Sequence, residues 1–161
     1  MKETIYLETT VVSYYTSKPS RDIIVLAHQE ITREWWDRAL KRYDAFISEI
    51  VVEEARAGDP EAAKKRLAIL KKFTHLDLSP MVEKMAKVYV EKLKIPPKAL
   101  RDAVHLAVAS VHSVDYLVTW NCSHIANGEV IRKLMQINMS HGIKTPIICT
   151  PEELMPKMKG E

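Results

Sequence analysis

The sequence predicts an α/β protein: a three-layer α/β/α sandwich with a central, mostly parallel sheet. Three observations lead to this prediction. Short apolar segments of strand-forming residues alternate with longer helical segments along the 161-residue chain. The strand segments are apolar throughout and do not alternate in polarity, which is typical of strands covered on both faces. Proline and glycine stand where helices are expected to begin or end.

Five segments are expected to form strands, because each is short, apolar and rich in β-branched or aromatic residues. They are residues 5–7, 44–48, 73–78, 116–119 and 146–149. The third is the least regular, since Thr74, His75 and Asp77 interrupt its apolar run.

The first two helices follow the first strand. Thr9 and Thr10 are expected to cap a helix that begins near Val11, and Lys18-Pro19-Ser20 ends it. Ser20 is expected to cap a longer helix whose apolar residues recur at spacings of three and four. The expected core face of that helix comprises Ile23, Ile24, Ala27, Ile31, Trp35 and Ala39.

The later helices carry clear start signals. Asp59-Pro60 and Ser79-Pro80 each combine a capping residue with proline at the first helical position. Further helices are expected at residues 49–57, 60–72, 80–94, 98–113 and 129–140, with a short terminal helix capped by Thr150. Residues 1–154 are expected to form one domain, and residues 155–161 a C-terminal tail.

Composition excludes several kinds of site. The four glycines lie far apart, so neither a dinucleotide-binding glycine loop nor a Walker A loop is present. The two cysteines form no C-x-x-C, and the six histidines include no H-E-x-x-H. No apolar run approaches the roughly 18 residues of a membrane span, and the N-terminus runs directly into a strand. We therefore expect a soluble, cytoplasmic protein, whose net charge of +3 is compatible with a nucleic-acid partner.

Polar residues at the predicted carboxyl ends of strands are the candidates for a site, because open parallel sheets bind ligands there. Glu8 follows the first strand, and Glu53 and Glu54 lie on the helix after the second. Asp102 lies near the start of a helix that is apolar nearly all round, where a carboxylate needs a cation, a cap or a metal. Asn121 follows the fourth strand.

Each candidate also has a structural interpretation. Glu8 and Asp102 could each be simple helix caps. Glu53 and Glu54 could each be surface residues, and Asn121 suits an ordinary turn. If the acids converge, they form a set of hard oxygen ligands that suits Mg²⁺ or Mn²⁺. Such a site is able to activate water and stabilise charge on a phosphate.

Four segments resemble the PIN-domain family of metal-dependent nucleases, which includes the VapC toxins of bacteria and archaea. They are residues 5–10 (IYLETT), 48–54 (SEIVVEE), 101–107 (RDAVHLA) and 115–121 (DYLVTWN). The last two carry most of the specificity, and the resemblance extends from residue 5 to about residue 154. It implies a parallel sheet between helices, RNA cleavage with Mg²⁺ or Mn²⁺ and, for toxins, inhibition by a small antitoxin protein bound near the active site.

The resemblance also assigns residues. Glu8 matches the family's first acid, which is usually Asp, and Glu54 matches the second, six residues after Ser48. Asp102 matches the third acid, and Asn121 stands where many members carry a fourth. The implied metal ligands are therefore Glu8, Glu54 and Asp102, with Asn121 as a fourth catalytic residue.

Two further positions match small hydroxyl residues that support the family's site, namely Thr9 and Thr119. Two features depart from the family pattern. The extra methylene of Glu8 extends its carboxylate, and the neutral Asn121 removes one negative charge. A PIN-like protein that binds RNA or a protein without cleavage is therefore an alternative to a nuclease, and a metal-dependent phosphatase is a third reading.

Other residues complete the expectations. Arg21, Lys98 and Arg101 lie near predicted helix starts and are candidates for phosphate contacts. His105 is expected to pack in the core. Trp35 and Trp36 are expected to pack in the core or between subunits, with antitoxin or RNA stacking as the alternative. The aromatic-rich long helix suggests a homodimer.

Overall fold

A computed structural model describes residues 1–157. Its sheet has the strand order β3-β2-β1-β4-β5, and every neighbouring pair is parallel. The strands are β1 (Thr4–Leu7), β2 (Asp44–Ile47), β3 (Thr74–His75), β4 (Tyr116–Val118) and β5 (Ile147–Cys149). The predicted parallel α/β fold is confirmed.

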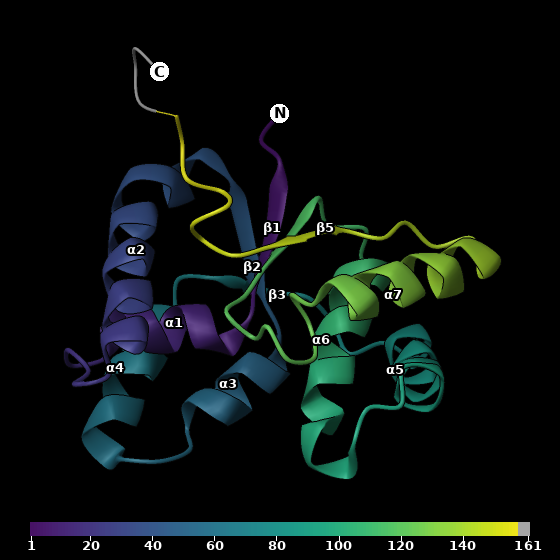
Figure 1. The fold of residues 1–161 in the computed structure, drawn as a ribbon, viewed down its shortest axis with the longest axis horizontal. Helices are drawn as coiled ribbons and strands as arrows, with labels where there is room; N and C mark the ends of the chain where they lie inside the picture. Colours follow the sequence, from purple (N-terminus) through teal and green to yellow (C-terminus); the bar gives the residue numbers. More distant parts are fainter. Residues whose placement is uncertain (158–161) are drawn as a thin grey trace.

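Helices cover both faces of the sheet. One layer contains α1, α2 and α4, and the layer across the sheet contains α5, α6 and α7 (Figure 1). The helices are α1 (Thr9–Thr16), α2 (Ile23–Ala39), α3 (Glu49–Ala55), α4 (Pro60–Leu70), α5 (Pro80–Lys92), α6 (Leu100–Val111) and α7 (Gly128–Ser140). Short 3₁₀ turns follow α2 (Leu40–Arg42) and precede α6 (Pro97–Ala99). No helix within residues 1–157 is long and apolar enough to cross a membrane.

The central strand explains why the sequence folds this way. Ile5, Tyr6 and Leu7 of β1 are fully buried, because strands pair on both sides of β1 and helices cover both of its faces. A strand in that position gains nothing from alternating polarity, which accounts for its continuous apolar sequence. The buried alanines of α6, Ala103, Ala107 and Ala109, belong to the same core.

The strand order creates a topological switch point beside β1. The chain runs outward from β1 to β2 and β3, and then returns to the other side of β1 to form β4 and β5. The segments that leave the carboxyl ends of β1 and β4 therefore diverge. Such a switch point is where open α/β sheets bind ligands, and Glu8 and Thr119 are the residues that follow these two strands.

Several local predictions were wrong. The third strand is only Thr74–His75, because polar side chains at a sheet edge provide little to bury. The capping interactions expected at Thr150 do form with Glu153, but residues 151–154 make a turn and no helix. Residues 158–161 of the expected tail lie outside the described part of the chain.

The starts of α1 and α2 also differ from the prediction. The cap of α1 is Glu8, whose side chain accepts from the Thr10 amide. The cap of α2 is Asp22, because its carboxylate accepts from two amides of the first turn. Ile23 and Ile24 are 80% and 65% exposed, so the expected core face is uncovered at its N-terminal end.

Candidate metal centre

Glu8 is buried at the carboxyl end of β1, with only 3% of its surface exposed. Its Oε1 atom accepts hydrogen bonds from the Thr10 amide (3.1 Å), the Thr10 hydroxyl and the Thr119 hydroxyl (2.6 Å). Burial raises the pKa of Glu8, although these bonds and the charge of His105 oppose the rise. The fold therefore holds a carboxylate where its negative charge is unfavourable unless a cation is nearby.

Glu54 reaches the same place from α3. It is half-buried, whereas the neighbouring Glu53 is exposed. The residue pattern alone left both glutamates open, and the resemblance implied Glu54. Oε1 of Glu54 accepts from the Thr9 hydroxyl (2.9 Å) and contacts Nε2 of His105 (2.5 Å). Thr9 and Thr119, the two hydroxyl residues expected beside the site, thus each bind one of the two carboxylates.

His105 is fully buried and links Glu54 to the core. Its Nδ1 atom lies 2.7 Å from the Tyr6 hydroxyl, which lies 2.7 Å from the Ser48 hydroxyl. Both ring nitrogens of His105 are therefore engaged. This chain of contacts connects α3, α6, β1 and the residue after β2, and it fixes the orientation of the Glu54 carboxylate.

The Glu54–His105 contact is an ion pair. Burial alone lowers the pKa of His105, but the hydrogen bond with Glu54 and the charges of Glu8, Glu54 and Asp102 outweigh burial, so the pKa is raised. Burial alone raises the pKa of Glu54, and the bond and charge of His105 outweigh it, so this pKa is lowered. The contact therefore favours the charged form of both groups.

Asp102 lies in the first turn of α6, three residues before His105, so the two side chains share a face of the helix. Burial raises the pKa of Asp102, opposed by a hydrogen bond with Asn121 and by the charges of His105 and His124, while Glu54 adds to the rise. Asp102 is thus in the same electrostatic environment as the two glutamates.

Asn121 is fixed by the loop after β4. Its amide donates to the Thr119 hydroxyl (2.9 Å), and its Oδ1 accepts from the His124 amide (3.0 Å). Its side chain also opposes the rise in the pKa of Asp102. The structure therefore places Glu8, Glu54, Asp102 and Asn121 in one electrostatic environment at the switch point beside β1.

The donor atoms fit a divalent cation. Glu8, Glu54 and His105 each place one potential ligand atom within 4.8 Å of the other two. Since both nitrogens of His105 are engaged, the carboxylates are the better ligands. Within residues 1–157, every hydrogen bond to either glutamate side chain ends on Oε1, which leaves both Oε2 atoms for a cation. Carboxylate oxygens are the ligands that Mg²⁺ and Mn²⁺ prefer.

The three candidate phosphate-binding residues are exposed. Arg101 is close enough to Glu54 for its charge to help lower the pKa of that carboxyl. Lys98 lies in the 3₁₀ turn before α6, and Arg21 precedes the cap of α2. Of these three residues, Arg101 is the one whose charge acts on a carboxylate of the centre.

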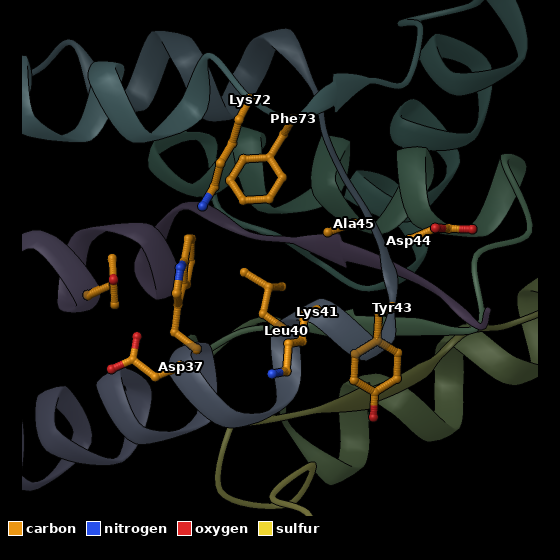
Figure 2. Close-up of a pocket in the computed structure, with 10 residues that line it drawn as sticks. Asp37, Leu40, Lys41, Tyr43, Asp44, Ala45, Lys72 and Phe73 are labelled. Carbon is orange, nitrogen blue, oxygen red and sulfur yellow. The ribbon is translucent and has the colours of Figure 1, made fainter.

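A cavity lies at the end of the sheet opposite to the carboxylates. It has a volume of about 520 Å³ and is lined at the amino end of β2 by Asp44 and Ala45 (Figure 2). Trp36 stacks on Tyr15 in its wall at 4.3 Å, and the Lys72 ammonium lies 5.4 Å from the Trp36 ring centre. The cavity includes none of the expected site residues.

The tryptophans of α2 are both buried within the subunit. Trp35 is fully buried and Trp36 is 6% exposed. Both residues therefore pack in the core, which was one of the alternatives that the sequence offered. They do not supply the apolar surface on which the homodimer was expected to form, and the homodimer itself stays a prediction that light scattering would check.

No family model and no curated protein matches the sequence. Among solved structures, the fold is similar to a chain in the crystal structure of VapBC2 from Rickettsia felis bound to a DNA fragment from their promoter. The TM-score is 0.54 at 17% identity, and the match covers 91% of this chain and 98% of that chain.

His105 is the residue of the centre that sequence reasoning missed. Its burial was expected, but its contact with Glu54 was not. The signal available was its spacing of three from Asp102, which places both residues on one face of α6. That spacing does not reveal which acid lies across from the imidazole, because Glu54 is 51 residues away in the chain.

Proposed function

We propose that this protein is a metal-dependent ribonuclease of the PIN type that hydrolyses RNA phosphodiester bonds. The observation that carries the proposal is the convergence of two carboxylates, each with one free oxygen, at the switch point of a VapBC2-like fold. The third carboxylate, Asp102, shares their electrostatic environment.

The residues have distinct roles in this proposal. Glu8, Glu54 and Asp102 would hold Mg²⁺ or Mn²⁺, which when bound supplies an activated water and neutralises charge on the phosphate. His105 orients Glu54 through their ion pair, and Thr119 orients Glu8. Asn121 positions Asp102 and is available to orient the attacking water. Arg101, with Lys98 and Arg21 farther out, would contact the phosphates of the RNA.

The cellular role follows from the same resemblance. We propose that the protein is the toxin of a toxin–antitoxin pair, acts in the cytoplasm as one domain over residues 1–154, and is held inactive by an antitoxin protein. The similarity to VapBC2 supports a partner of this kind. Co-purification of a small protein encoded beside the gene, together with loss of cleavage in its presence, would test the pairing.

Cleavage of a mixed-sequence single-stranded RNA tests the activity. The wild type is compared in Mn²⁺ and in EDTA, beside Asp102→Asn. The matched control is Asp44→Asn, which makes the same chemical change at an exposed position at the opposite end of the sheet. We expect cleavage that requires the metal, is lost in Asp102→Asn and persists in Asp44→Asn.

Other outcomes would change the conclusion. Undiminished cleavage by Asp102→Asn would refute the assignment of this residue. RNA binding without cleavage by the folded wild type would favour a non-cutting member, in which Glu8 and Asn121 are the first residues to change to Asp. Hydrolysis of a generic phosphate ester but not of RNA would indicate a phosphatase.

A further inference from the structure

Three aromatic side chains from separate segments form a cluster beside the carboxylates. The imidazole of His28 and the indole of Trp120 are stacked, with ring centres 4.0 Å apart and planes 12° apart. The ring of Tyr14 lies 6.4 Å from each of them. We refer to Tyr14, His28 and Trp120 as the ring cluster. None of the roles proposed above uses it.

The ring cluster is attached directly to the surroundings of Glu8. The Trp120 amide donates to the Thr10 hydroxyl (2.9 Å), and that hydroxyl in turn donates to Glu8. Tyr14 lies one helical turn beyond Thr10 on the same face of α1. Burial raises the pKa of Tyr14, and the negative charge of Glu8 adds to the rise.

The cluster has a rigid base and accessible outer rings. Nε1 of Trp120 donates to the Thr32 hydroxyl (2.7 Å), and only 8% of this tryptophan is exposed. His28 and Tyr14 are half-buried and present the outer surface. An aromatic ring that is already fixed loses little conformational entropy when a flat ligand stacks on it.

Two basic residues lie on the loop between α1 and α2, the two helices that carry Tyr14 and His28. Gln29, only 3% exposed, holds this loop by donating to the Ser17 hydroxyl (2.8 Å) and accepting from the Ser20 amide (2.9 Å). The loop carries Lys18 and Arg21, both exposed. Flat aromatic surface next to fixed cations is the combination that binds single-stranded nucleic acid.

We propose that the ring cluster is a subsite for one unstacked nucleobase of single-stranded RNA, next to the phosphate at the carboxylates. The inference rests on the proposed ribonuclease function and adds to it the place that receives one base of the RNA, which must be unpaired because a base inside a duplex does not expose its face. His28 and Tyr14 stack on the base, while Lys18 and Arg21 contact the adjoining phosphate.

Fluorescence anisotropy of labelled single-stranded RNA tests the subsite, in EDTA so that the RNA stays intact. The probes are a hexamer and a set of its versions with one abasic site at successive positions. The proteins are the wild type, His28→Ala, Tyr14→Leu and Tyr14→Phe. His141→Ala is the matched control, because His141 is exposed at the C-terminal end of α7.

We expect His28→Ala and Tyr14→Leu to weaken binding of the intact hexamer by about 5- to 100-fold, the range for loss of one base–aromatic stack. Tyr14→Phe keeps the ring and should bind as the wild type does, as should His141→Ala. One abasic position should weaken wild-type binding by a similar factor and have little further effect on His28→Ala. This non-additivity distinguishes a lost stack from a general disturbance of folding.

Equal binding of intact and abasic RNA by the wild type would overturn the subsite, and so would additive losses in His28→Ala. Metal-dependent cleavage that persists in either case would leave the proposed function standing. Failure of the wild type to bind any of the RNAs would overturn the subsite, while the cleavage assay in Mn²⁺ tests the proposed function separately. Affinity of the cluster for an apolar peptide but not for the base would refute the subsite in favour of a protein contact.

Discussion

Removing the Tyr6 hydroxyl should destabilise the protein more than removing a comparable buried hydroxyl elsewhere. Tyr6→Phe keeps the fully buried ring and deletes only the oxygen that lies 2.7 Å from both His105 and Ser48. The matched control is Tyr89→Phe, since Tyr89 is also fully buried and its hydroxyl donates to Asn138.

The expected magnitudes follow from the charges of the partners. A hydrogen bond to a charged group contributes about 1.5–3 kcal/mol and one between neutral groups about 0.5–1.5 kcal/mol. Tyr6 has one of each when His105 is protonated, the form that the contact with Glu54 favours. We therefore expect Tyr6→Phe to lower the free energy of unfolding by about 2–4 kcal/mol, against about 1 kcal/mol for Tyr89→Phe.

Urea denaturation measures the difference. With a slope of about 2 kcal/mol per molar urea, Tyr6→Phe should lower the midpoint by about 1–2 M. Cleavage should fall by about 10- to 100-fold, since His105 no longer holds Glu54 firmly. Equal midpoints for Tyr6→Phe and Tyr89→Phe would refute the reasoning, as would an excess cost that does not shrink at pH values where His105 is neutral.

Three other changes have expected outcomes. Glu8→Gln keeps the Oε1 acceptor and removes a buried charge, so the free energy of unfolding without metal should rise by about 0.5–2 kcal/mol. Stabilisation by Mn²⁺ should disappear in the same variant. Thermal denaturation measures both effects, and a lower stability of Glu8→Gln without metal would contradict the prediction. The pKa of His105 is raised from 6.5, so the stability contributed by its pair with Glu54 is complete below about pH 6.5 and is lost as the pH rises through the folded-state value. His105→Gln should flatten that decline in urea titrations at several pH values, and an unchanged slope would argue against the pair. Leu117→Ala empties a fully buried site in β4 and should cost about 2–5 kcal/mol by urea denaturation; a loss below about 1 kcal/mol would mean that the core collapses around the cavity.

The order of strands and helices was predictable because its signals are short-range. Asp59 and Ser79 cap α4 and α5 as expected, since a capping side chain bonds to amides two or three residues away. The continuous apolar sequence of β1 likewise indicates a strand covered on both faces. Such signals act within one turn or one strand, and they are complete in the sequence itself.

The exposed face of α2 was not predictable in the same way. The spacing of Ile23 and Ile24 matches that of Trp35, yet the two isoleucines are exposed and the tryptophan is buried. Periodicity shows which residues share a face of a helix, but only the neighbouring elements decide how much of that face is covered.

The candidate centre likewise has one part that the sequence predicted and one part that only the tertiary structure showed. The sequence by itself placed Glu8, Asp102 and Asn121 at strand ends or a helix start, because these positions depend on local boundaries. Only the tertiary structure joined Glu54 to His105 and placed the ring cluster beside Glu8. Those contacts join residues far apart in the chain, and their existence depends on the order in which the strands pair.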